Sequence, residues 1–140
     1  MIQRIQTLFL AGAAAAGMVL FYLPMFSYTT ADEVSRHEFF IGENIFLTSL
    51  NSLGILLALV TVFMYKNRLN QLKICSLNML LVSVFIVSNF YFSDKPVSAE
   101  AGIHFEMGSY LILANLVLLW LAVRFIRKDE KLIRSADRLR

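Results

Sequence analysis

Two histidines with carboxylates nearby are the residues in this sequence whose types could support metal chemistry. His37 precedes Glu38, and His104 lies two residues before Glu106. If these two segments meet, imidazole nitrogens and carboxylate oxygens could hold a divalent metal ion. Adjacent residues seldom point at one ion, however, and two histidines among scattered acids are common by chance. His37 and His104 are therefore weak metal candidates, and the sequence predicts neither a metal site nor a cofactor.

Other reactive arrangements are missing from the 140 residues. There is no CxxC or HExxH motif and no phosphate-binding glycine loop, and the serines and threonines of the apolar segments have no base beside them. Cys75 is the only cysteine, so an intrachain disulfide is excluded and we interpret the thiol as a small buried hydrophobic group. The sequence thus predicts a protein that is not an enzyme.

Four asparagines lie inside long apolar segments, where polar groups are costly: Asn51, Asn78, Asn89 and Asn115. Asn78 and Asn89 are eleven residues apart, which directs them to nearly the same side of a helix. We interpret these amides as interhelical hydrogen-bonding groups within a bundle. A polar pocket lined by Asn51, Asn78 and Asn115 is the alternative. Amides cannot carry protons, so a proton pump is not expected.

Small residues accompany these asparagines at helical spacing. In one segment Asn51 is followed by Gly54, Ala58 and Thr61 at intervals of 3, 4 and 3, and Asn115 lies seven residues from both Gly108 and Ala122. Such spacing is typical of the seam between left-handed packed helices.

The elements that must position these residues are four apolar runs, which contain no Lys, Arg, Asp or Glu except at the edges of the last. They cover about residues 5–26, 44–65, 74–93 and 105–126. Of the whole chain, 58% is hydrophobic and only 16% is charged, unlike a soluble domain. About 20 residues of helix cross a hydrocarbon core of about 30 Å, and lipid leaves the edge of an open sheet unsatisfied. We therefore predict an all-α membrane protein, a four-transmembrane-helix antiparallel bundle over residues 1–126.

The segments between the runs are polar. Residues 93–104 contain Pro96 and Gly102 and are predicted to be irregular. Residues 28–30 could form a short strand, although nothing requires one.

Basic residues set the orientation. Only two of the 13 Lys and Arg residues, Arg36 and Lys95, fall on the side of residues 27–43 and 94–104, and the other eleven fall on the opposite side. By the positive-inside rule both termini are cytoplasmic. The basic charge is thus a signal of topology and gives no support to nucleic-acid binding.

The first apolar run contains seven small residues in succession, Ala11 to Gly17. A signal peptide would place such residues at the end of its apolar core, whereas here they lie in the middle of a run, so we expect this helix to be retained. Pairs four residues apart, such as Gly12 and Ala16, suit close contact with neighbouring helices.

Residues 127–140 form a basic, amphipathic cytoplasmic tail that either continues the fourth helix or turns along the membrane surface. Its candidate contact residues are Arg127, Lys128, Lys131, Arg134 and Arg138. We expect these side chains to meet anionic lipid headgroups. Docking onto a cytoplasmic protein is the alternative, because the tail mixes both signs of charge.

The two ends of the chain resemble those of a known protein family. MIQRIQTLFL at residues 1–10 and RKDEKLIRSADRLR at residues 127–140 resemble a family of small four-span membrane proteins from Bacteroidota that is catalogued as a domain of unknown function. The resemblance covers essentially the whole chain. It implies a four-helix architecture in the bacterial inner membrane and brings no activity.

Three features favour a non-enzymatic accessory, assembly or scaffold subunit of a larger inner-membrane complex. They are the helix faces lined with small residues, the tail of mixed charge and the lack of reactive groups. The expected partners are membrane lipids and either another protein or further copies of the chain. Two alternatives are a small oligomeric transport or lipid-binding module with an amide-lined pocket, and an envelope sensor that uses its acidic outer loops.

Overall fold

The structure is a computed structural model that describes residues 3–29, 36–64, 67–93 and 103–137. These residues form four α-helices, three short strands and one 3-10 turn. In chain order they are α1 (Gln3–Val19), β1 (Phe26–Thr29), β2 (Arg36–Phe39), η1 (Ile41–Glu43), α2 (Ile45–Phe63), α3 (Arg68–Ser93), β3 (Ile103–Phe105) and α4 (Met107–Asp137).

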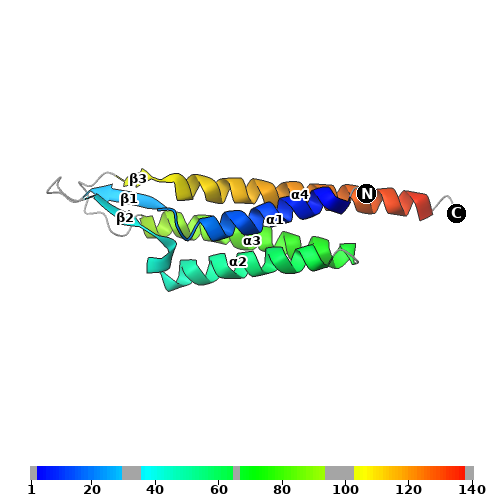
Figure 1. The fold of residues 1–140 in the computed structure, drawn as a ribbon, viewed down its shortest axis with the longest axis horizontal. Coiled ribbons are helices and arrows are strands. Elements are labelled where there is room, and N and C mark those ends of the chain that lie inside the picture. The colour runs from blue at the N-terminus through cyan, green and yellow to red at the C-terminus, as the bar shows by residue number, and fades with distance from the viewer. Residues whose placement is uncertain (1–2, 30–35, 65–66, 94–102, 138–140) are drawn as a thin grey trace.

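The four helices lie side by side as an elongated bundle, with the strands gathered at one end (Figure 1). Each helix contacts two others: α1 and α3 both pack against α2 and α4. The start of α1 and the end of α4 lie at the same end of the bundle, opposite the strands. The predicted antiparallel arrangement of four helices is therefore present.

Three helices are long and apolar enough to cross a membrane, namely α2, α3 and residues 107–132 of α4. The apolar part of α1, Ile5–Val19, is shorter. We predicted a first segment that continues to about residue 26, and this boundary is wrong. After Val19 the chain turns, with the Tyr22 amide donating to the Val19 carbonyl, and Pro24 has no amide hydrogen with which to continue a helix.

The strands form a small antiparallel sheet in the order β2–β1–β3. Phe26 is opposite Phe39 on one side and Phe105 on the other, and its ring stacks on that of Phe39 with centroids 4.6 Å apart. The prediction of an all-α protein is therefore wrong at this end. So is the prediction of an irregular segment through residue 104, because Ile103 and His104 belong to β3. These short runs lacked the length and alternation that predict a strand.

A corner at Pro24 and Met25 joins the sheet to the helices. The Met25 amide donates to the Phe39 carbonyl, and the Met25 carbonyl accepts from the Glu106 amide, each at 2.8–3.0 Å. The Gly108 amide donates to the Pro24 carbonyl at 3.0 Å. This corner holds the end of α1, the end of β2 and the start of α4 together.

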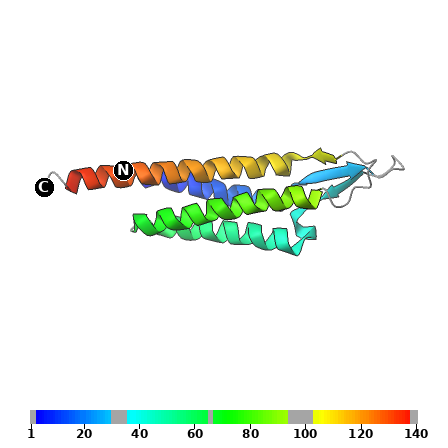
Figure 2. The same ribbon diagram turned by 180° about the vertical axis from the view of Figure 1, so that it is seen from behind.

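The last helix is the longest element. It has 31 residues, so at 1.5 Å per residue it is about 46 Å long, against about 28 Å for the 19 residues of α2. Figures 1 and 2 show α4 running past the ends of the other helices. Of the two alternatives for the tail, the structure therefore has the continued helix.

Candidate functional site

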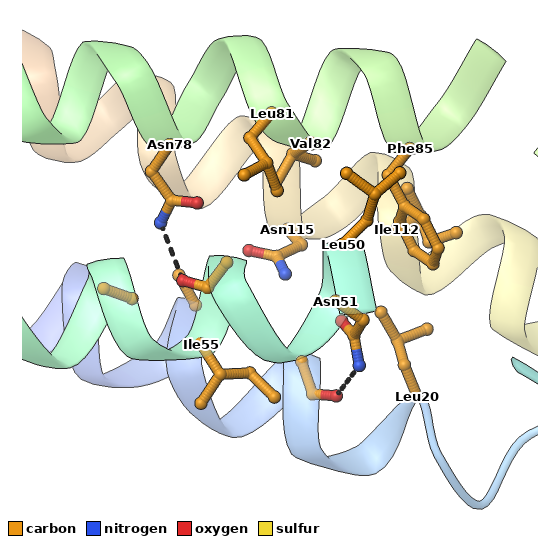
Figure 3. A pocket seen from close by; sticks show the side chains of 14 residues that line it. Leu20, Leu50, Asn51, Ile55, Asn78, Leu81, Val82, Phe85, Ile112 and Asn115 are labelled. Carbon is orange, nitrogen blue, oxygen red and sulfur yellow. Dashed lines mark hydrogen bonds between the residues drawn. The ribbon is translucent and has the colours of Figure 1, made fainter. Parts of the chain in front are cut away.

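The middle of the bundle contains amide side chains that bridge neighbouring helices. Asn51 of α2 donates from Nδ2 to the Gly17 carbonyl of α1 at 2.9 Å, and Asn78 of α3 donates from Nδ2 to the Gly54 carbonyl of α2 at 3.1 Å (Figure 3). Both asparagines are at least 94% buried. Each therefore bonds its amide nitrogen to the backbone of the preceding helix, at a glycine where two helices approach closely.

Two buried amide oxygens in this region have no hydrogen-bond partner. They are Oδ1 of Asn78 and Oδ1 of Asn115, which point into the same space in the middle of the four helices (Figure 3). The cavity there has a volume of about 10 Å³, which is about that of one water molecule. It is too small to hold a lipid or an organic solute. Asn51, Asn78 and Asn115 all line this cavity, which in this conformation accommodates only a very small molecule.

Asn89 belongs to a different cluster. It lies three turns further along α3, and its Nδ2 donates to Ser109 Oγ of α4 at 3.2 Å. The Ser109 hydroxyl in turn donates to the Met25 carbonyl. The common direction of Asn78 and Asn89 on the helix was thus a sound inference, but eleven residues of helix separate them by about 16 Å, so they serve separate contacts.

Most of the small residues of α1 face other helices, whereas Ala11 and Ala15 are exposed. Ala16 is 8% exposed, and a Cβ on Gly12 would meet Leu118 of α4 at 3.7 Å. The small and polar residues predicted for the seams of α2 and α4 are buried as well: Asn51, Gly54, Ala58, Thr61, Gly108, Asn115 and Ala122.

The two histidines do not meet. His37 is opposite Tyr28 in the sheet and stacks on its ring, whereas His104 is opposite Ser27. Side chains of consecutive strand residues point to opposite faces, so His37 and His104 lie on opposite faces of the sheet. Across the described ranges, no group of three or more metal-ligating residues is found.

Basic residues gather on one face of α4 beyond its apolar part. Arg127, Lys128 and Lys131 are exposed and line one groove together with Arg124. Of the remaining tail candidates, Arg138 lies outside the described residues, and Arg134 is described only as part of the α4 backbone.

Comparison with known proteins shows the family to which the chain belongs. The model of a family named DUF4293, a domain of unknown function, matches residues 2–139. The chain belongs to this family. The resemblance found at the two ends of the sequence is thereby confirmed at the level of an uncharacterised family. No curated protein matches the chain.

One polar contact in this DUF4293 chain was missed by sequence reasoning. Gln6 of α1 donates from Nε2 to the carboxylate of Asp129 in α4, and the side chains are 6% and 4% exposed. Asp129 falls within the predicted basic tail of residues 127–140, yet it is buried against α1. Two features of the sequence could have indicated this contact. Gln6 is a single glutamine in the first apolar run, and Asp129 is a carboxylate within a basic stretch.

Proposed function

We infer that this protein is a non-enzymatic integral membrane protein that acts as an accessory or scaffold subunit of a larger complex in the bacterial inner membrane. In this proposal α1 crosses the membrane together with α2, α3 and α4, and both termini are cytoplasmic. The positive-inside distribution of Lys and Arg supports this orientation.

The outer surface of the bundle supports a location in lipid. Large apolar side chains with more than half of their surface exposed occur on α2, α3 and α4, including Leu56, Leu80 and Val117. A soluble protein rarely exposes so many large apolar groups on adjoining faces. In a bilayer these apolar faces would contact the apolar acyl chains of the lipid.

The single observation that carries the scaffold role is the projecting end of α4. Leu132 is 50% exposed there, and Lys131 and Ser135 are exposed as well. A short helix without tertiary support is only marginally stable in water. Docking of this end against another protein would cover Leu132 and stabilise the helix.

A crosslinking experiment in the native host tests this role. A photo-crosslinking amino acid in place of Leu132 should capture one protein, and the same protein should co-purify in stoichiometric amount with the unmodified chain in mild detergent. The matched control places the crosslinker at Leu80, which is 62% exposed on the apolar face of α3. Recovery of the isolated chain alone, in several detergents and from both positions, would overturn the proposal.

A further inference from the structure

A groove between α3 and α4 combines apolar walls with four cationic side chains. Its walls are formed by Met79 of α3 and by Trp120, Arg124, Arg127, Lys128 and Lys131 of α4, and its volume is about 520 Å³. We call this surface the basic groove. Glu130 lies in an adjoining hollow with Arg127 and Lys131, and Asp129 is buried against Gln6 on another side of the helix.

The four cations follow helical geometry. Positions 124, 127, 128 and 131 are spaced 3, 1 and 3, so they form one stripe along a single face of α4. From Arg124 to Lys131 the stripe covers about 10 Å along the helix axis. Such a stripe presents several donors to an anion that lies alongside the helix.

The level of the stripe fits the headgroup layer of a bilayer. Residues 107–123 of α4 contain no charged side chain, which gives about 25 Å of apolar helix before Arg124. Lys73 is the last charged residue of α3 before its apolar part, and it lies two residues before Cys75, whose thiol is 3.9 Å from the Leu119 carbonyl. The apolar part of α3 therefore begins close to the level at which that of α4 ends. Each headgroup layer is about 5–7 Å thick, and the stripe crosses it.

Trp120 and Arg124 mark the boundary. The Arg124 guanidinium lies 5.5 Å from the centroid of the Trp120 ring, a cation–π distance that orients the guanidinium. Tryptophan is enriched at the membrane interface. The groove thus offers an acyl chain an apolar wall below Arg124 and offers a phosphate several cationic donors above it.

We propose that the basic groove is a binding site for an anionic phospholipid, with the lipid phosphate held by Arg124, Arg127, Lys128 and Lys131 and an acyl chain lying against Met79 and Trp120. The proposal does not depend on the scaffold role, because it requires no protein partner. Guanidinium and ammonium groups bind phosphate through charge-assisted hydrogen bonds.

Trp120 is the only tryptophan of the chain, so its fluorescence reports on this groove alone. The purified full chain would be reconstituted in nanodiscs of phosphatidylcholine that contain a small fraction of brominated phosphatidylglycerol or, separately, of brominated phosphatidylcholine with the same acyl chains. We expect the brominated phosphatidylglycerol to quench Trp120 more strongly at equal mole fraction. Each basic residue near an anionic surface contributes about a fivefold factor, so R127Q/K131Q should lower the preference for phosphatidylglycerol by at least about fivefold.

The matched control is R68Q/K73Q, which removes two charges at the same end of the bundle but away from the groove. It should keep the preference of the unmodified chain. Added glycerol phosphate, which has the headgroup chemistry without acyl chains, should not compete. Equal quenching by the two lipids in the unmodified chain, or an equal loss in both double variants, would overturn the proposal. So would competition by glycerol phosphate, which would indicate a site for a soluble anion.

Discussion

Replacement of Gly108 by alanine is the sharpest test of the corner that joins the sheet to the helices. An added Cβ would lie 2.6 Å from the Pro24 carbonyl oxygen and 2.8 Å from the Met25 sulfur. The first of these atoms is backbone and cannot rotate away. The start of α4 must therefore move from the corner by about half an ångström, which lengthens the hydrogen bonds that Gly108 and Glu106 donate to it.

The expected change in the free energy of unfolding is the sum of two destabilising contributions and one stabilising contribution. Forcing an extra methyl group into a packed site costs about 1–3 kcal/mol. Weakening of the two hydrogen bonds adds roughly 0.5–1.5 kcal/mol for each bond that is lost. The higher helix propensity of alanine returns at most about 1 kcal/mol. The expected net loss is about 2 kcal/mol, or about 6–8 °C in the unfolding midpoint for a chain of this size.

Cys75 provides the assay. It is the only cysteine and is completely buried, so a fluorogenic maleimide should react with it only when the bundle opens. Thermal labelling curves of the purified chain in mild detergent would be compared for the unmodified protein, Gly108→Ala and Gly12→Ala. The last variant is the matched control, because its added Cβ has its nearest contact at an ordinary 3.7 Å and it gains helix propensity.

We expect Gly108→Ala to lower the midpoint and Gly12→Ala to leave it unchanged or raise it. An unchanged or higher midpoint for Gly108→Ala would refute the reasoning, because it would mean that the contact between α4 and the Pro24 carbonyl does not constrain the fold.

Three further predictions concern polar side chains, and the same labelling assay measures the first two. Asn115→Leu should stabilise the chain by about 1–3 kcal/mol because it removes an acceptor that has no partner, whereas Asn51→Leu should destabilise it through the loss of the bond to α1; the reverse order would be inconsistent with the structure. Gln6→Leu should cost about 1–3 kcal/mol by leaving the Asp129 carboxylate without its donor, and Gln6→Leu with Asp129→Leu should recover most of this loss; additive losses would argue against direct coupling. Asn44 accepts at Oδ1 from the Phe46 and Leu47 amides, so Asn44→Ala should cost about 1 kcal/mol and speed amide hydrogen exchange in the first turn of α2 and nowhere else.

The helices of this protein could be predicted from the sequence because their apolar runs are long. The spacing of Asn51, Gly54, Ala58 and Thr61 also indicated which side of α2 would be buried, since small and polar residues are concentrated where apolar helices meet. The sequence identified the asparagines of the middle of the bundle, but it did not indicate that Asn51 and Asn78 would bond to backbone carbonyls at Gly17 and Gly54.

The sheet and the buried carboxylate could not be predicted in the same way. A strand of three or four residues has too little alternation to be told from a loop, and its formation here depends on pairing between residues that are far apart in the chain, such as Phe26 and Phe105. The burial of Asp129 likewise depends on how the first and last helices align, which no local pattern encodes.

The Pro24–Met25 corner has a mechanical consequence. Hydrogen bonds at this corner join three separate parts of the chain, at Pro24–Met25, at Phe39 and at residues 106–108, so they hold the bundle together at the end that carries the sheet. The opposite end is held by contacts between side chains and neighbouring helices, among them the Gln6–Asp129 hydrogen bond, the stacked rings of Phe9 and Phe125, and the Gln71 side-chain amide bonded to the Thr61 carbonyl. A force on the projecting end of α4 would therefore tend to tilt that helix about its start, where its backbone is bonded to Pro24 and Met25.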